Sequence, residues 1–288
     1  MDGPLTGIIV NTEKPGAADV LQQLLAKFEA AGIETRLEEK TAQLIGKSDG
    51  RNVLELMDEI DLVVLLGGDG TILHFVEAVG ARVKPIAAIN IGTLGFLTLA
   101  TTERLDEVVS LIAERAYKLS QRSVIAVRVF EDGQLTKEWF ALNEVSVSRG
   151  GVSRLVRVQA KVNGEFLTRF SGDGLIVATP TGSTAYSLSA GGPLIEPEAE
   201  VFVVTPVCPH SLASRPLVVS QKSIIEIEAP EQRDAVFMTV DGQDVHRVGS
   251  ATRLEIRRAD FTVPLVTSAQ HSFYGVLRKK LEWSGSNS

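Results

Sequence analysis

The sequence has one cysteine, no excess of positive charge and no long apolar run. Cys208 is the only cysteine among 288 residues, so no internal disulfide can form, which fits a reducing compartment. No apolar run approaches the roughly 18 residues of a membrane span. The N-terminal residues lack the basic and apolar regions of a signal peptide. We therefore expect a cytoplasmic protein that does not enter a membrane.

Acidic residues outnumber basic ones. The 36 Asp and Glu residues exceed the 29 Lys and Arg residues and give a formal net charge of -7. Because nucleic-acid binding usually needs a basic face, we expect no nucleic-acid partner. The balance still allows a local basic pocket for a phosphorylated small molecule. The length fits one large domain or two of ordinary size.

The first part of the chain alternates between strand and helix patterns. Residues 62–66 form a continuous apolar run, which is typical of a strand buried on both faces of a parallel sheet. Apolar residues recur at helical spacing over 20–28, and Gly32 follows as a C-cap. Further strands are expected at 7–11, 33–37 and 85–91, and further helices at 72–79 and 105–112. This alternation predicts a Rossmann-like open α/β sheet domain over residues 1–120.

From residue 121 the pattern becomes rich in strands and hairpins. Turn signals occur at Asp132-Gly133, Asn163-Gly164 and Asp241-Gly242. Strands are expected at 124–129, 139–147, 155–162, 175–178, 201–205, 224–227, 235–240 and 254–257. We predict a β-rich domain of layered sheets over 121–270. A helix over 273–283, within a C-terminal segment 271–288, is expected to return to the first domain.

A glycine-rich loop follows the buried strand at 62–66. It consists of Gly67, Gly68, Asp69, Gly70 and Thr71. Glycines let the backbone approach a phosphate closely, and the following helix N-terminus favours negative charge. A carboxylate repels phosphate, so Asp69 suggests a chemical role, such as accepting a hydroxyl proton or holding a metal. The alternative is a tight turn with Asp69 as a helix cap. The loop matches neither a P-loop nor a dinucleotide fingerprint.

Two other segments are unusually polar. Residues 179–193 consist mostly of Ser, Thr and Gly, with Tyr186 and Leu188 among them, and follow Asp173. Hydroxyls, backbone amides and one aromatic ring suit a base, ribose or phosphate, whereas a solvent-exposed loop is the alternative. Asn143 and Glu144 interrupt an apolar strand pattern. The pair could bind ribose hydroxyls, or it could lie at a strand end, an edge or a bulge.

Together these segments resemble the NAD kinase family. The resemblance rests on residues 65–73, 89–97, 142–144, 173–193 and 240–243, in the family's order. The loop at 67–71 alone is not specific, since lipid kinases and phosphofructokinases carry similar loops, but the segment 179–193 is far more specific. The resemblance implies phosphorylation of NAD to NADP at the 2′-hydroxyl of the adenosine ribose, with ATP or another phosphoryl donor.

The resemblance also implies roles for individual residues. Asp69 would be the general base, with Gly67, Gly68, Gly70 and Thr71 forming the phosphate loop. The remaining NAD-binding residues implied are Asn143, Glu144, Arg154, Asp173, Thr184, Ala185, Tyr186, Ser187, Leu188, Ser189 and Gln243. His74 lies one helical turn after Asp69 and could face the same site, whereas a structural histidine is the alternative. Arg154 would reach substrate, sometimes in a neighbouring subunit, and a homodimer or homotetramer is implied. Ser171 departs from a basic residue found in some members, and nearby Arg169 could replace it.

Metal and thiol chemistry receive less support from the sequence. No His, Cys and Asp cluster has metal-ligand spacing, so we expect no protein metal site and Mg²⁺, or another divalent cation, to accompany ATP. Cys208 lies near His210, yet nothing nearby suggests acyl transfer, so we expect a small buried structural cysteine. Two alternatives to an NAD kinase are a lipid or sugar kinase that shares only the first loop, and a non-catalytic nucleotide-binding regulator.

Overall fold

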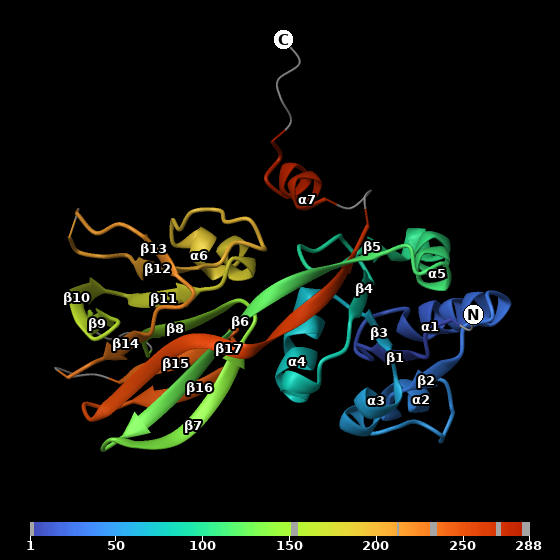
Figure 1. Cartoon of the computed structure of the whole chain (residues 1–288), viewed down its shortest axis with the longest axis horizontal. Helices are drawn as coiled ribbons and strands as arrows, with labels where there is room; N and C mark the ends of the chain where they lie inside the picture. Colours follow the sequence, from blue (N-terminus) through green and yellow to red (C-terminus); the bar gives the residue numbers. More distant parts are fainter. Residues whose placement is uncertain (1–2, 151–154, 212, 231–234, 269–271, 284–288) are drawn as a thin grey trace, which may run out of the picture. The chain divides into compact units, whose positions relative to one another are not determined.

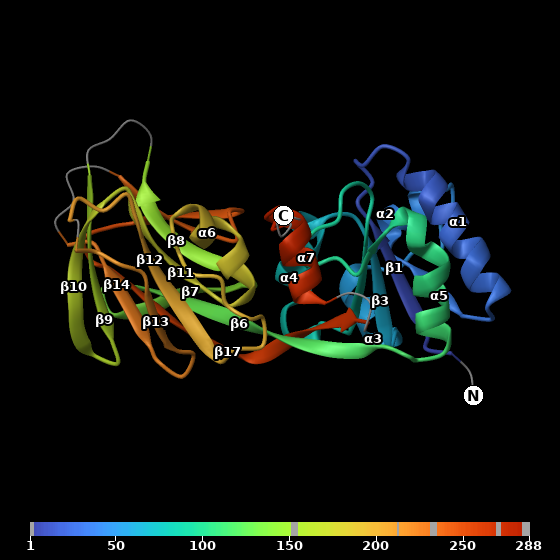
Figure 2. The same cartoon turned by 90° about the horizontal axis from the view of Figure 1, so that it is seen from above.

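The computed structural model describes residues 3–150, 155–211, 213–230, 235–268 and 272–283. Its contacts divide the chain into two compact units, residues 1–121 with 263–288 and residues 122–262. Figures 1 and 2 show the elements of both units. Each unit is described separately below. Among the described residues, no helix has the length and apolar character needed to span a membrane.

The first unit is an open sheet with helices on both faces. Its strands are β1 (Thr6–Val10), β2 (Thr35–Leu37), β3 (Leu62–Leu66), β4 (Ile86–Asn90) and β5 (Ala100–Thr101). They are parallel in the order β2-β1-β3-β4-β5, and the end of β17 (Thr252–Thr267) also pairs with β4 in parallel. All five residues of β3 are buried, which confirms the predicted parallel strand.

Helices cover this sheet on its two sides. The helices of this unit are α1 (Ala17–Ala30), α2 (Glu39–Leu44), α3 (Val53–Glu59), α4 (Asp69–Val79), α5 (Leu105–Ala113) and α7 (Phe273–Lys280), with 3-10 turns η1 (Gly80–Arg82) and η2 (Thr102–Arg104). Leu21 and Leu24 of α1 and Val108 of α5 pack with Ile8 and Val64 of the sheet. A Cβ at Gly7, on the opposite face, would meet Ile60 and Leu56, so α3 covers that face (Figure 2).

The second unit is a sandwich of two sheets. The strands that complete it are β6 (Lys118–Glu131), β7 (Gln134–Ala141), β8 (Glu144–Arg149), β9 (Val156–Val162), β10 (Glu165–Gly172), β11 (Gly174–Ala178), β12 (Val201–Val207), β13 (Leu217–Ser220), β14 (Ile225–Glu228), β15 (Val236–Val240) and β16 (Asp244–Val248). One layer has the order β10-β9-β14-β17, with β6 beside β17 and β7 beside β6. The other has the order β13-β12-β11-β8-β15-β16.

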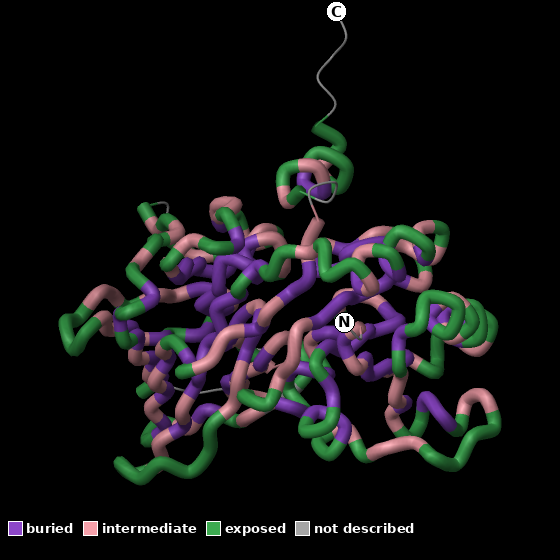
Figure 3. The backbone as a smooth tube through the Cα atoms, turned by 45° about the vertical axis from the view of Figure 1, so that its right-hand side comes forward, coloured by how far each residue is buried: buried purple, intermediate pink, exposed green. Residues whose placement is uncertain are grey.

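The core of the second unit lies between its two sheets. Val127 and Ile256 from one layer pack with Val147, Val177 and other apolar side chains of the second layer. Figure 3 shows this burial along the backbone. The outer face of the second sheet is covered by a 3-10 turn, η3 (Thr181–Thr184), and a short helix, α6 (Tyr186–Ser189). The predicted fold class, an α/β domain with a β-rich layered domain and a C-terminal helix, is confirmed.

Three hairpins contain the predicted turns; two residues separate the paired strand ends at 132–133 and 163–164, and three do so at 241–243. The first turn residue has φ of 50° at Asp132, 53° at Asn163 and 48° at Asp241, and each glycine that follows is also left-handed. Positive φ at both central positions defines a type I′ turn, whose twist matches that of paired strands. One smaller expectation is wrong. Cys208 follows β12 in an exposed position instead of being buried, because the chain leaves the sheet there with φ of 43°.

Candidate active site

The predicted residues fall into two groups, one in each unit. In the first unit, β3 ends at Leu66 and α4 begins at Asp69, so the glycine-rich loop lies at the carboxyl end of a parallel strand. This edge of an open α/β sheet is where such folds bind ligands. Gly70 is exposed, and no atom lies within 4 Å of where its Cβ would be. The backbone at Gly70 is therefore open to a ligand.

The Asp69 carboxylate is fixed by a second loop. Its Oδ2 accepts a hydrogen bond from the Phe96 N–H (2.9 Å), and its Oδ1 accepts one from the Leu97 N–H (3.1 Å). A Cβ at Gly95 would lie 2.0 Å from Oδ1, so only glycine leaves room for the carboxylate. Each oxygen keeps a further lone pair, which can accept a proton from a substrate. The segment 89–97 thus positions Asp69.

The loop backbone is braced by a hydroxyl. Thr71 Oγ1 accepts a bond from the Gly68 N–H (3.3 Å) and one from Asn11 Nδ2 (3.4 Å). A Cβ at Gly67 would lie 2.2 Å from the same oxygen. Gly67 and Thr71 therefore shape the loop from within. His74 lies on α4 with its side chain 79% exposed, and its Nδ1 is 3.8 Å from the Glu77 carboxylate.

In the second unit, Asn143 and Glu144 lie where β7 ends and β8 begins. The strand predicted over 139–147 is thus two strands with a break at this polar pair. The Asn143 carbonyl accepts from the Thr179 N–H (2.8 Å), and the Leu142 carbonyl accepts from Thr179 Oγ1 (2.6 Å). Gly182 packs directly on this break, because its Cβ would be 2.1 Å from the Asn143 carbonyl oxygen.

The Glu144 side chain is almost fully buried, with 8% exposure. Its carboxylate accepts from the backbone N–H of Tyr186, and Oε2 has no partner among the described residues. Burial, together with the charge of Asp241, raises the pKa of Glu144 to about 8. The carboxyl group is therefore mostly protonated at neutral pH and can donate a hydrogen bond.

The residues of 184–189 differ in how far they are buried. Tyr186 is exposed on α6, whereas Ser187 is buried and its Oγ lies 2.9 Å from Thr205 Oγ1 on β12. Thr184 Oγ1 donates to the Thr181 carbonyl (3.1 Å). Ala185 and Leu188 are half-buried and Ser189 is exposed. This segment therefore presents both a covered hydroxyl and an exposed aromatic ring next to Glu144.

Asp241 is a residue of this group that sequence reasoning did not single out. Its carboxylate accepts hydrogen bonds from the N–H groups of Leu142 (2.8 Å), Asn143 (2.8 Å) and Glu144 (2.9 Å). The only sequence signal was its place in a turn within the segment 240–243. Gln243, two residues later, is exposed in the same hairpin. The hairpin thus joins the group at Asn143 and Glu144.

Other predicted residues lie apart from this group. Asp173 precedes β11, whereas Glu144 is opposite Ala178 at the other end of that strand. The Asp173 carboxylate forms an ion pair with Arg149, with Nε and Oδ1 3.3 Å apart. Arg154 lies outside the described residues. Ser171 lies on β10 with Arg169, whose Nη2 donates to Gln159 Oε1 (3.4 Å).

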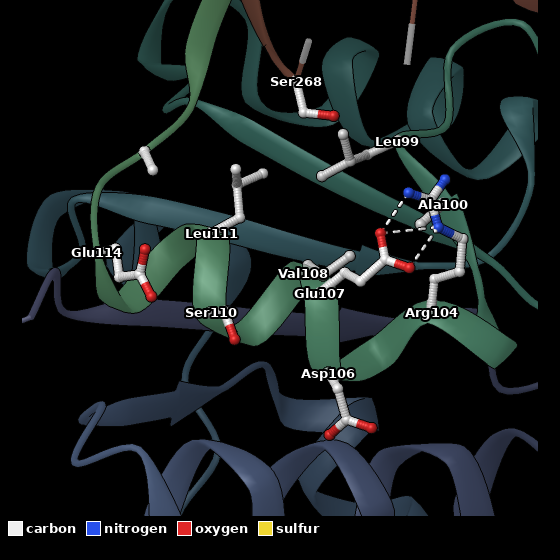
Figure 4. Close-up of a pocket in the computed structure, with 11 residues that line it drawn as sticks. Leu99, Ala100, Arg104, Asp106, Glu107, Val108, Ser110, Leu111, Glu114 and Ser268 are labelled. Carbon is white, nitrogen blue, oxygen red and sulfur yellow. Dashed lines mark hydrogen bonds and ion pairs between the residues drawn. The ribbon is translucent and has the colours of Figure 1, made fainter. Parts of the chain in front are cut away.

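A cavity of about 600 Å³ lies along α5 of the first unit, and its lining includes no residue of the glycine-rich loop (Figure 4). Its lining combines apolar side chains such as Leu99 and Leu111 with charged groups. Arg104 and Glu107 in this lining bond to each other. Because the cavity contains none of the predicted site residues, its size does not make it the candidate active site.

Comparisons with known proteins agree on one family. Residues 6–117 match the model of the ATP-NAD kinase N-terminal domain, and residues 142–268 match that of the C-terminal domain. The NAD kinase of Syntrophotalea carbinolica is 38% identical over 280 residues, covering 96% of this chain and 98% of the relative. That of Trichlorobacter lovleyi is 35% identical over 277 residues, covering 96% of this chain and 97% of the relative.

Solved structures show the same similarity. The structure of yeast NADH kinase complexed with NADH matches with a TM-score of 0.89 and 26% identity, covering 99% of this chain and 89% of that chain. An NAD kinase from Archaeoglobus fulgidus in complex with ATP matches with a TM-score of 0.74 and 26% identity, covering 98% of this chain and 100% of that chain. The matched domains include both groups of site residues. The chain belongs to the NAD kinase family and is a kinase.

Proposed function

We propose that this chain phosphorylates the 2′-hydroxyl of the adenosine ribose of NAD, using ATP as donor, and so produces NADP. The observation that carries the proposal is the placement of Asp69. Its carboxylate is held by the amides of Phe96 and Leu97 at the carboxyl end of β3, beside the open backbone of Gly70. The family membership supports NAD and ATP as the substrates, as do the NADH and ATP in the two related structures.

Asp69 would act as the general base. The ribose oxygen forms a bond to the γ-phosphorus, the bond from that phosphorus to ADP breaks, and the hydroxyl proton passes to Asp69. An alcohol is a poor nucleophile at neutral pH, so a carboxylate within hydrogen-bond reach assists as the new bond forms. The glycine amides and the N-terminus of α4 would favour the phosphate charge. Gly67, Gly68, Gly70 and Thr71 form this phosphate loop.

The second unit would hold the nucleotide. Asn143 and Glu144 would contact adenosine, and a protonated Glu144 can donate to a ribose oxygen. Thr184, Ala185, Tyr186, Ser187, Leu188 and Ser189 would enclose the nucleotide, with Gln243 as a further contact. His74 on α4 would add a contact from the first unit. Asp173 and Arg154 would serve a site completed by a neighbouring subunit, which fits the position of Asp173 at the far end of β11 from Glu144. A homodimer or homotetramer in the cytoplasm is part of this proposal.

A divalent cation is expected with the donor. Among the described residues, no group of three or more His, Cys, Asp and Glu side chains comes together. We assign Mg²⁺ to the ATP phosphates. Bound there, the metal would neutralise charge on the transferring phosphoryl group.

A coupled assay tests the proposed function. The protein is incubated with NAD, Mg²⁺ and ATP, and NADP is measured with an NADP-specific dehydrogenase. Inorganic polyphosphate replaces ATP in a second series, which identifies the donor. The proposal fails if neither donor yields NADP. Formation of a phosphorylated lipid or sugar instead would favour a kinase that shares only the glycine-rich loop.

A further inference from the structure

We propose that Asp241 is a positioning residue that shapes the 142–144 break so that Asn143 and Glu144 meet the nucleotide. The inference rests on the proposed function and extends it to a residue that would not itself touch substrate. Asp241 lies in the hairpin between β15 and β16, whereas the pair that it positions lies between β7 and β8.

The carboxylate of Asp241 bonds three consecutive backbone amides. Oδ2 accepts from the Leu142 N–H, and Oδ1 accepts from the N–H groups of Asn143 and Glu144, all within 2.9 Å. In return, the Asp241 N–H donates to the Glu144 carbonyl (2.9 Å). Consecutive amides that point the same way form a concave anion-binding site. Here a side chain of the same protein occupies that site and fixes the local backbone.

The turn itself does not require this carboxylate. Asp241 adopts a left-handed φ of 48° in an Asp-Gly type I′ turn, and Asp132 and Asn163 adopt the same conformation in the other two hairpins. Asn163 shows that an amide is accepted at this turn position. Asparagine at position 241 is therefore expected to keep the hairpin and to change only what the side chain offers to 142–144.

An amide cannot replace the carboxylate at this break. A carboxylate is an acceptor at both oxygens, whereas an asparagine side chain has one oxygen and an NH₂ group that only donates. In Asp241→Asn, the NH₂ group takes the place of one carboxylate oxygen. It then faces either the Leu142 N–H or the N–H groups of Asn143 and Glu144, and two donors cannot bond to each other. Backbone amides that lose a buried partner shift until they find another. The break then no longer holds Asn143 and Glu144 in one geometry.

The experiment compares the wild type with Asp241→Asn and with Asp132→Asn as the matched control. Asp132 is in the same left-handed position of the same turn type, but its side chain is exposed. We expect the Kd and KM for NAD to rise roughly 5- to 150-fold in Asp241→Asn, the range for a buried donor without a partner. The KM for ATP stays within about twofold, and Asp132→Asn behaves as the wild type.

A double-mutant cycle separates positioning from general destabilisation. If Asp241 acts through Glu144, the loss of NAD affinity caused by Asp241→Asn is smaller in a Glu144→Gln background than in the wild type. If the two residues act independently, the two losses of binding free energy add. Hydrogen exchange supplies a readout apart from activity, since peptides covering 142–144 should exchange faster in Asp241→Asn while those covering 163–165 do not. If Asp241→Asn does not fold, Asp241→Ser, which retains one hydroxyl acceptor, takes its place in every arm.

The outcomes distinguish this inference from the proposed function. A wild-type protein that makes no NADP contradicts the proposed function, whatever the variants do. An active wild type with an Asp241→Asn variant equal to Asp132→Asn, or with strictly additive effects in the cycle, overturns the positioning role. Equal losses in NAD and ATP affinity would also overturn it, because they indicate a general loss of structure.

Discussion

Asp69 combines two requirements of a general base. Two backbone amides orient its carboxylate, and the remaining lone pairs can take a proton. In Asp69→Asn the side chain keeps its size but loses basicity, and its NH₂ group would face an amide donor. We expect turnover to fall by about two to four orders of magnitude. Measured NAD affinity should change little, because we assign most of the nucleotide contacts to the second unit.

The measurement for Asp69→Asn is the coupled NADP assay together with calorimetric titration of NAD. Unchanged turnover would remove Asp69 from the role of base. A large loss of NAD affinity with unchanged maximal turnover would instead make Asp69 a binding residue.

Glu144 and Asp241 form a buried acidic pair with a predictable response to pH. Burial raises the pKa of Glu144 from 4.5 to about 8 and that of Asp241 from 3.8 to about 6. An acid with a raised pKa in the folded state binds its proton more tightly there than in the unfolded chain. Between pH 4.5 and 8 the folded Glu144 therefore keeps a proton that the unfolded chain has released, and stability falls as pH rises.

We expect Glu144→Gln, a neutral side chain of the same shape, to remove most of that slope. The shift of Glu144 corresponds to at most about 5 kcal/mol, at 1.36 kcal/mol per pKa unit. Urea unfolding of the wild type and the variant from pH 5 to pH 9 measures it. A wild-type free energy of unfolding that rises with pH relative to Glu144→Gln over this window contradicts the assignment.

At the scale of elements, η3 follows β11 and packs against the break at 142–144. Gly182 of η3 lies against the Asn143 carbonyl, where a Cβ would be 2.1 Å from the oxygen. In Gly182→Ala either η3 or the break must move, so we expect NAD affinity to fall at least about tenfold and the protein to lose stability, by analogy with overpacked sites. Calorimetric titration and thermal unfolding measure the two effects.

Gly3→Ala is the control for Gly182→Ala. The added methyl group at Gly3 would meet Ile33 at 3.6 Å, an ordinary contact. Equal NAD affinity in the two variants would show that η3 does not hold the break in place.

Elements with strong periodicity could be predicted from the sequence. Helix α1 and strand β3 carry clear apolar patterns, and both were expected. Helix α2 was missed because only Thr41 and Ala42 of its six residues are buried, which leaves no apolar stripe. The apolar residues on both sides of Asn143 are typical of one strand, so the break between β7 and β8 could be expected only as the alternative, a strand end at the polar pair.

The candidate site could be predicted where local motifs mark it, as at Asp69, Asn143 and Glu144. Asp241 has an ordinary explanation as a turn residue, and that explanation conceals its second role. Its three partners lie 97 to 99 residues earlier in the chain, so no spacing in the sequence connects them. Such a contact becomes visible only once β8 and β15 are paired in one sheet.

At the scale of the whole molecule, an acidic protein has to bind two phosphorylated substrates. The net charge of -7 and the pI of about 5.3 give no general attraction for ATP or NAD. Local groups must therefore supply the positive potential, and we assign that role to backbone amides, the N-terminus of α4 and the metal on ATP.

This assignment predicts how the enzyme responds to a chelator. We expect EDTA to abolish NADP formation and excess Mg²⁺ to restore it, because the metal enters with ATP. The thermal unfolding temperature should not change with EDTA if the protein has no structural metal. A lower unfolding temperature in EDTA would reveal a resident metal ion and contradict this prediction.

The contacts of Asp241 also bear on how the protein is made. The break at 142–144 leaves the ribosome about 100 residues before the carboxylate that holds it, so the nascent chain carries Asn143 and Glu144 without their support while these residues are synthesised. Contacts so distant in sequence form late in folding, because a long loop has to close first. The ability to bind NAD should therefore arise only after the hairpin of β15 and β16 has been synthesised.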